Sequence, residues 1–447
     1  MCVLVAYATG AGPSGGEAQV GYADAWDARA FTRAEKLRLA VAATDDPSLL
    51  RHRPVPGTDM DPLKPPGFAG LDWPGVDEMF RFRFNGIVTY RDGFAYAPTS
   101  DALASRIQRW LKLPLEQARA EFGDSDANSA GPALAVTYDA ASIEKVSYRP
   151  FDVRFLYNRP QYVDRMRPPL QAAWGLQNCA LFTLKDGTGA GPAAWCHGLK
   201  PDQHAFRGSY GGWAFPFRNH NPEGSSHHLQ PALIAGLASV YGLPVTALDV
   251  FDAILALLSA KSYTTRFAFD LEDDFPHVPF PADHAIFTDA AAIGARVRAL
   301  QGLDAAPDPA FRSARLAGRA SGPALDVPAP RQAFVGDGTA GTVALLADRS
   351  LYLERVPERV WRFAVSGYPV LHRWLRARNG EALTGPGGVA LQRAALDLAW
   401  RIEELLGLYD AADTVLIRAL AAPLTRADLG LHEAEPAVVV EDQDGPA

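Results

Sequence analysis

The segment from Tyr148 to Leu170, "YRPFDVRFLYNRPQYVDRMRPPL", gathers arginines and aromatic rings in a protein whose formal net charge is −8. Guanidinium groups bind phosphates and the guanine edge in pairs of hydrogen bonds, and aromatic rings stack on bases. The same pattern suits a buried hairpin in which Arg149–Asp152 and Arg154–Asp164 form internal ion pairs. Residue types alone leave both roles open. The basic residues in and beside the segment are Lys145, Arg149, Arg154, Arg159, Arg165 and Arg167.

A glycine-rich motif offers a second kind of chemistry. "GDGTAG", Gly336 to Gly341, matches the G-x-G-x-x-G pattern of dinucleotide-binding folds. A helix of several turns must follow such glycines, but the strand-like "SLYLERV" begins within ten residues. The motif therefore favours a flexible turn. Neither a G-x-x-x-x-G-K-[ST] phosphate loop nor the [DN]-P-P-[YFW] motif of amino-methylating enzymes occurs in the sequence.

Groups of acids, histidines and cysteines could in principle bind a metal or form a nucleophile. Cys196 and His197 are adjacent, so on a strand they point to opposite faces and would not share one metal or proton. The nuclease-like set around Asp139 is loosely spaced. We therefore predict no catalytic residue and no metal site. The other groups considered are Glu144 with Lys145, His227 with His228, and Glu272 with Asp273 and Asp274.

Length and composition indicate a folded protein of two or three domains. The chain has 447 residues, of which 48% are hydrophobic and 21% charged. Three cysteines give no disulfide framework, which favours a reducing cytoplasm. We expect neither export nor a membrane span, because the sequence has no apolar run of about 18 residues.

The patterns predict a mixed α/β fold of short strands with flanking helices and a smaller C-terminal α/β unit. Aromatic and basic residues alternate along "FRFRFNGIVTYRDGFAYAP", as on a half-exposed strand. Leu103, Ile107 and Trp110 share one face of a helix that Pro114 ends.

Further helices are expected towards the C-terminus. Thr246 can cap the amide of Asp249 at the start of an apolar helix. Another helix should begin after Thr288 and end near Leu300. The final unit should contain strands at "SLYLERV" and "WRFAVSGYPV" and an amphipathic helix carrying Leu391, Ala395, Leu398, Ile402 and Leu405.

The expected division of the chain follows its composition. Residues 303–332 are rich in Ala, Pro and Gly, as linkers are, and the acidic C-terminus is typical of a disordered tail. The expected parts are an N-terminal region (1–115) that opens with the strand "CVLVAYATG", a core (116–302), the linker (303–332), a C-terminal α/β unit (333–428) and the tail (429–447).

An ordered series of segments resembles the C-terminal target-recognition (specificity) region of Type ISP restriction-modification enzymes. The opening "MCVLVAYATG" is similar to the end of the methyltransferase module that precedes this region in the family. "FDAILALLSAKSYTTRF" departs from the family's Tyr-rich helix and His-Ser-Pro stretch, and "FPF" replaces the usual "FPLY". The resembling segments are "FNGIVTYRDGF", "YRPFDVRFLY" with Arg165 following, "GGWAFPF", "DVFDAILALLSAKSYTTRFAFDLEDDFPHVPFP" and "WRFAVSGYPVLHRWLRARNGEAL".

The resemblance implies that this chain reads double-stranded DNA sequence. Full-length members of the family join a nuclease, an ATP-driven translocase, an adenine-N6 methyltransferase and this recognition region. The chain corresponds to the last part, so methylation and restriction are expected from domains outside it, on a separate chain if the gene is split. S-adenosylmethionine, ATP and magnesium are expected only in those domains, and no cofactor in this chain.

The site predicted from the resemblance and the basic residues is a positive cleft that grips the duplex. Asp92, Phe151 and Asp152 are expected to hold the motif in place. Arg373, Arg376 and Arg378 are further candidates from the final unit. The predicted DNA-binding residues are Arg81, Arg83, Thr89, Arg91, Tyr148, Arg149, Arg154, Tyr157, Arg165, Arg167, Lys261, Tyr263 and Arg266.

Two other functions remain open on the sequence. A degenerate or split fragment could fold and bind a methyltransferase or translocase partner without reading DNA, and the net acidity favours this protein-interaction role. An independent enzyme could use the glycine-rich turns for a nucleotide. A neighbouring upstream gene for a methyltransferase with the [DN]-P-P-[YFW] motif would favour DNA recognition.

Overall fold

The computed structural model describes residues 21–22, 33–49, 53–54, 72–175, 177–206, 211–220, 226–383, 385–431 and 436–440. Internal contacts divide the chain into two units, Met1–Asp72 and Trp73–Ala447. The described part of the first unit holds helix α1 (Arg33–Asp45) and the antiparallel pair β1 (Gly21–Tyr22) and β2 (Arg53–Pro54). The predicted strand at "CVLVAYATG" lies outside the described residues.

The division after Asp72 differs from the boundary expected at 115. Val76, Met79 and Phe80 are fully buried in the second unit. They lie in and beside the short helix α2 (Val76–Met79), which immediately follows the division. Apolar packing therefore makes the segment from Trp73 part of the larger unit.

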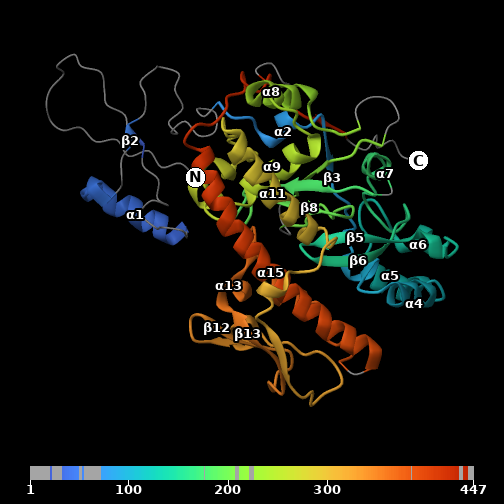
Figure 1. Cartoon of the computed structure of the whole chain (residues 1–447). Helices are drawn as coiled ribbons and strands as arrows, with labels where there is room; N and C mark the ends of the chain where they lie inside the picture. Colours follow the sequence, from blue (N-terminus) through green and yellow to red (C-terminus); the bar gives the residue numbers. More distant parts are fainter. Residues whose placement is uncertain are drawn as a thin grey trace. The chain divides into compact units, whose positions relative to one another are not determined.

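The larger unit contains a five-stranded sheet in the order β16-β3-β9-β7-β8 (Figure 1). Neighbouring strands are antiparallel, except that β16 runs parallel to β3. Every residue of β7 and β8 is buried, which explains why "ALFT" and "AWCH" show no polar alternation. The strands are β3 (Phe82–Asn85), β7 (Ala180–Thr183), β8 (Ala194–His197), β9 (Trp213–Pro216) and β16 (Val438–Val439).

Three helices pack together beside this sheet. Helices α9 (Ala247–Ser259) and α11 (His284–Gln301) contact β8, and the long α15 (Gly385–Ala419) packs on both of them (Figure 1). All ten residues from Val250 to Ser259 are buried, so α9 is the central helix of the unit.

Short-range hydrogen bonds set the helix starts. The Thr246 hydroxyl accepts a hydrogen bond from the Asp249 amide at 3.1 Å, which confirms the predicted cap of α9. Helix α11 begins at His284, earlier than predicted, because the Asp283 carboxylate accepts from the Ala285 amide at 2.7 Å. Helix α4 (Ser100–Trp110) ends before Pro114, as predicted.

A smaller three-stranded sheet, ordered β4-β6-β5, contains the segment rich in arginine and aromatic residues. Leu103, Ile107 and Trp110 of α4 share a buried cluster with Tyr157 of this sheet. The elements are β4 (Tyr96–Ala97), β5 (Ile143–Arg149), β6 (Asp152–Tyr157), α3 (Asp92–Ala95), α4, α5 (Leu115–Phe122) and α6 (Ala130–Leu134).

The C-terminal α/β unit begins inside the segment expected to be a linker. Strand β10 (Arg315–Gly318) pairs with β13 (Leu351–Pro357), and Leu325 and Val327 are buried, so residues 315–327 belong to the folded unit. The sheet order is β10-β13-β12-β11. The other elements of the C-terminal α/β unit are β11 (Phe334–Gly336), β12 (Ala340–Ala344), β14 (Ala364–Val365), β15 (Tyr368–Pro369), α12 (Pro330–Ala333), α13 (Glu358–Arg362) and α14 (Val370–Arg376).

The predicted disordered tail is partly folded. Val438 and Val440 donate amide hydrogen bonds to the carbonyls of Arg81 and Arg83 at 3.0 and 3.1 Å, which places β16 at the edge of the main sheet. Residues 441–447 lie outside the described part. The mixed α/β class is confirmed. The remaining elements are α7 (Pro168–Trp174), α8 (Pro231–Tyr241), α10 (Tyr263–Arg266) and the 3-10 turns Pro47–Leu49, Ala140–Ser142, Asp270–Glu272 and Pro309–Phe311.

Candidate nucleic-acid interface

The segment rich in arginine and aromatic residues forms the β5–β6 hairpin. Its turn places Phe151 in the left-handed region, with φ of 61°. The Phe151 ring meets Trp195 of β8 edge-on, with the ring centroids 5.0 Å apart. Packing against the main sheet therefore accompanies an unusual backbone conformation, which fits the predicted structural role of Phe151.

Tyr148 lies at the centre of a charged cluster on this hairpin. The guanidinium carbons of Arg149 and Arg154 lie 3.9 and 4.6 Å from its ring centroid. The Tyr148 hydroxyl donates to Asp92 at 2.8 Å, and Arg149 donates to Asp202 at 2.9 Å. Burial raises the pKa of Tyr148 above its usual range, which favours the protonated hydroxyl that donates to Asp92.

Asp152 connects the hairpin to the C-terminal α/β unit. Its carboxylate is 1% exposed and accepts hydrogen bonds from Arg154 at 2.9 Å and from Arg378 at 2.8 Å. The Arg378 guanidinium also lies 3.8 Å from the Trp374 ring centroid. Both arginines are thereby engaged inside the protein, and this arrangement fits the structural role predicted for Asp152.

Arg91 is enclosed by polar partners. It forms a 2.8 Å ion pair with Asp164, and both side chains are almost fully buried. It also donates to the Ser125 hydroxyl at 2.7 Å and to the Tyr162 carbonyl at 3.2 Å. Burial lowers the pKa of Arg91, although Asp164 opposes the change. The guanidinium thus has no surface to offer DNA in this conformation.

The ion pairs expected from sequence spacing have different partners. Arg149 pairs with Asp202 at 2.9 Å, although the strand register places it opposite Asp152. Arg154 pairs with Asp152, and Asp164 pairs with Arg91. The internal pairing itself is present, so the structural interpretation of the segment accounts for Arg149 and Arg154.

Three other predicted DNA-binding residues are buried. Thr89 is 1% exposed, while Tyr157 and Tyr263 are fully enclosed. The Tyr157 hydroxyl accepts from the Asp139 amide at 3.0 Å, and the Tyr263 hydroxyl donates to the His277 carbonyl at 2.5 Å. Like Arg91, these side chains offer no surface for direct DNA contact in this conformation.

Arg81, Arg83 and Arg167 are half-buried. Arg81 donates to the His227 carbonyl at 3.1 Å. Arg83 lies 4.7 Å from the Trp213 ring centroid and forms a 3.4 Å ion pair with Asp77. Arg167, at φ of 57°, donates to the Gly86 carbonyl at 3.1 Å and to Gln203 at 2.9 Å.

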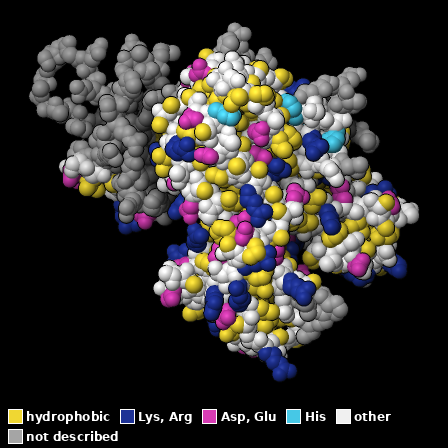
Figure 2. Space-filling view, viewed as in Figure 1, with side chains coloured by type: hydrophobic (Ala, Val, Ile, Leu, Met, Phe, Trp, Pro, Cys, Tyr) yellow, Lys and Arg dark blue, Asp and Glu magenta, His cyan; other side chains and the backbone are white. Residues whose placement is uncertain are grey.

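The remaining predicted basic residues are exposed. Lys261 pairs with Asp410 at 3.2 Å. Figure 2 shows Lys and Arg side chains mixed with Asp and Glu on the visible face, which therefore presents no continuous basic surface. The structure brings Tyr148, Arg149 and Arg154 together, but they pair internally. The exposed predicted residues are Arg165, Lys261, Arg266, Arg373 and Arg376.

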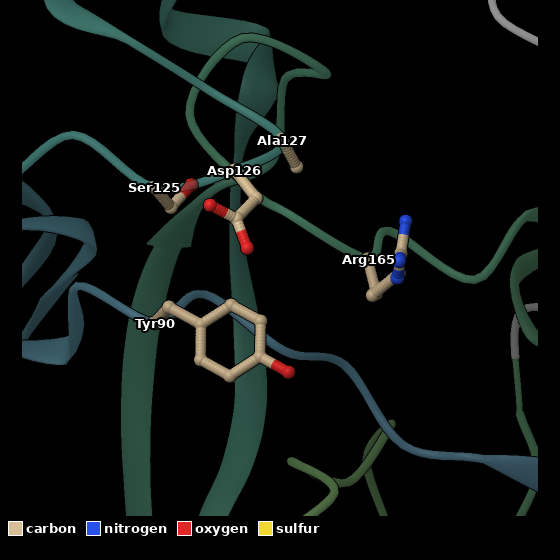
Figure 3. Close-up of a pocket in the computed structure, with 5 residues that line it drawn as sticks. All are labelled: Tyr90, Ser125, Asp126, Ala127 and Arg165. Carbon is tan, nitrogen blue, oxygen red and sulfur yellow. The ribbon is translucent and has the colours of Figure 1, made fainter.

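Tyr90 was not among the residues predicted from the sequence. The residue is 74% exposed, and its φ is 48°. Tyr90 lines an open pocket of about 490 Å³ together with Ser125, Asp126, Ala127 and Arg165 (Figure 3). Tyr90 lies within the segment "TYRDG", but the alternating pattern of that stretch does not distinguish an exposed ring from a buried one.

The other motifs have structural explanations. "GDGTAG" is the hairpin turn between β11 and β12. In this turn the Asp337 carboxylate accepts hydrogen bonds from the backbone amides of Thr339 and Ala340. Burial lowers the pKa of His197 to about 3, so it is a neutral core residue. Among the described residues, no cluster of His, Cys, Asp and Glu is suited to a metal, and no helix is long and apolar enough to cross a bilayer.

Most of the sequence matches one known protein family. Residues 78–392 match the sequence profile of the Type ISP C-terminal specificity domain. The chain belongs to this family. The match includes the β5–β6 hairpin, the pocket and most of the C-terminal α/β unit, so one specificity domain extends across the boundary expected at 302. No curated protein gives a significant match to the chain.

Three solved structures contain a part whose fold is similar to that of this chain. The DrdV–DNA complex has a TM-score of 0.53 and 19% identity, covering 77% of this chain and 36% of that one. The ATP-dependent Type ISP enzyme LlaBIII bound to DNA has a TM-score of 0.61 and 13% identity, and the match covers 83% of this chain and 26% of that one. A nuclease-deletion mutant of the Type ISP enzyme LlaGI with a DNA substrate mimic has a TM-score of 0.54 and 16% identity, and the match covers 92% of this chain and 38% of that one. This chain therefore corresponds to between 26% and 38% of those proteins.

Proposed function

We propose that this chain recognises a specific sequence in double-stranded DNA for a Type ISP-like restriction-modification system. The observation that carries this proposal is the match of residues 78–392 to a specificity domain. The three similar structures contain DNA or a DNA mimic, which supports duplex DNA as the partner. In this proposal, cytoplasmic domains outside the chain bind S-adenosylmethionine, ATP and magnesium and carry out adenine-N6 methylation and restriction.

The geometry narrows the set of DNA-contacting residues. Arg91, Arg149, Arg154 and Arg378 are engaged by the carboxylates of Asp164, Asp202 and Asp152, and we assign them to holding the domain together. Phosphate contacts set the position of a protein on DNA, whereas base-edge contacts specify the sequence. We assign phosphate contact to the exposed arginines of α14, Arg373 and Arg376.

The test is binding of the purified chain to a pool of randomised duplex DNA across a salt series. We expect enrichment of one short sequence. Replacing Arg373 and Arg376 by Gln should weaken binding to all sequences alike and reduce the slope of log K against log salt by about 1.8, since each phosphate contact contributes about 0.9. The matched control is Arg359→Gln/Arg362→Gln on α13, whose arginines are also exposed and pair with Asp410 and Glu358.

A second candidate function is a protein-interaction module for a methyltransferase or translocase partner. The internal pairing of Arg91, Arg149 and Arg154 favours it, because these guanidiniums are not presented to DNA. Weak, salt-sensitive binding without enrichment of any sequence would support this second function and contradict the first.

A further inference from the structure

Three loops meet at the Tyr90 pocket, and a buried polar network holds them together beneath it. Arg165 exchanges backbone hydrogen bonds with Val88 at 2.9 and 3.1 Å. The side-chain amide of Asn128 donates to the Val163 carbonyl at 3.1 Å. Arg91 binds both Ser125 and Asp164. The loops around 88–92, 123–128 and 163–167 are therefore fixed relative to one another, as a recognition site requires.

The local backbone directs Tyr90 outward. Its two neighbours, Thr89 and Arg91, are 1% and 6% exposed. Tyr90 itself adopts a left-handed conformation that is unfavourable for a bulky residue, and the residue is 74% exposed. Residues held in such conformations often mark functional sites. An exposed ring held in this way is available to a partner.

The chemistry of the pocket matches a base edge better than a phosphate. Figure 3 shows the Asp126 carboxylate pointing toward the Tyr90 ring, with Arg165 across the opening. A carboxylate repels phosphate, so it disfavours a DNA backbone contact here. In the major groove, arginine donates to O6 and N7 of guanine, and aspartate accepts from N4 of cytosine. Arg165 thus supplies donors of the kind that guanine binds, and Asp126 supplies an acceptor of the kind that cytosine binds.

We propose that Arg165 and Asp126 read one G·C base pair in the major groove, with the Tyr90 ring forming an apolar wall of that contact. This inference rests on the proposed function and names the base pair that this pocket recognises. The wall reduces water access to the two charged groups, which strengthens their hydrogen bonds to the bases. Arg91 is a positioning residue, because it holds Ser125 and Asp164 beneath the pocket.

The experiment is selection from randomised duplex DNA with the full chain, comparing the wild type with Arg165→Ala and Asp126→Ala. We expect both variants to lose the preference for G·C at the same single position. Affinity for the selected site should fall roughly 5- to 150-fold, the range typical of one good base contact, with little change for sites already altered there. Tyr90→Ala should weaken the same preference.

The matched control is Asp289→Ala and Arg418→Ala, an exposed Asp–Arg ion pair of 2.8 Å between α11 and α15. These variants should leave the selected sequence unchanged. Thermal melting checks folding, and Arg165→Gln and Asp126→Asn replace any alanine variant that melts early.

The outcomes separate the inference from the proposed function. If the wild type enriches no sequence, the proposed function fails and the inference fails with it. If the wild type selects a site but the two variants relax different positions, or weaken all sequences equally, only the inference is overturned. A shared loss at one G·C position supports both.

Discussion

At the scale of residues, Asp152 shows how a recognition-like motif can be structural. Its carboxylate is 1% exposed and contacts Arg154 and Arg378, which are 16% and 9% exposed. A buried ion pair contributes little net stability relative to apolar packing, but removing one partner leaves an uncompensated charge. Asp152 is therefore needed to keep the two buried arginines satisfied.

We expect Asp152→Ala to lower the free energy of unfolding by about 3–5 kcal/mol, the usual cost of breaking a buried pair. Urea denaturation of the wild type and the variant measures this difference in the free energy of unfolding. Asp410→Ala is the control: Asp410 pairs with Arg359 and Lys261 at the surface, where a pair contributes at most about 1 kcal/mol. Equal effects of the two substitutions would contradict the structural role of Asp152.

At the scale of elements, the close approach of α9 and α11 depends on Gly294. A Cβ placed there would lie 1.7 Å from the Asp252 carbonyl oxygen, much closer than atoms can approach. The contact is reinforced by Arg298 of α11, which donates to the Asp252 carboxylate at 2.6 and 3.0 Å. Glycine here permits helix packing that any side chain would push apart.

Gly294→Ala should therefore destabilise the protein by about 1–3 kcal/mol or more, since an overpacked core must shift its backbone. Thermal and urea denaturation provide the measurement. Gly131→Ala in α6 is the matched control, because a Cβ there meets no atom within 4 Å. The control should be neutral or stabilising by up to about 1 kcal/mol. An equally neutral Gly294→Ala would show that the helices are not in contact as described.

At the scale of the whole molecule, strands far apart in the sequence share one sheet. Strand β16 near the C-terminus pairs in parallel with β3, which lies near the start of the second unit. The Ala437 amide donates to the Asp77 carbonyl at 2.6 Å, and Val438 continues the pairing. The described part of the acidic C-terminus thus completes the sheet edge.

Val438→Pro removes the amide that donates to Arg81, and we expect a loss of about 1 kcal/mol from the free energy of unfolding. Hydrogen exchange should show faster exchange at Ala437 and Val440. Val439→Pro is the control, since alternate amides of an edge strand point away from its neighbour. Slow exchange retained at Val440 in Val438→Pro would contradict the pairing of β16.

The sequence by itself determined the features that depend on near neighbours in the chain. Thr246 lies three residues from the amide that it caps, and the glycines around Asp337 allow a tight turn whatever surrounds them. The family could also be recognised from the sequence, because an ordered series of matching segments is far more specific than one motif. Helix α11 begins at His284 and not after Thr288, because the Asp283 carboxylate caps it. The prediction began too late because it did not consider Asp283 as the cap.

Only the tertiary structure decided which arginines face inward. Arg91 and Asp164 are 73 residues apart, Arg149 and Asp202 are 53 apart, and Arg378 and Asp152 are 226 apart. Spacing could not reveal such partners, since arginine suits a buried carboxylate and DNA equally well. Tyr90 became a candidate because Thr89 and Arg91 are buried and its own ring is not. Long-range packing assigns each side chain to the core or the surface, and residue type alone does not.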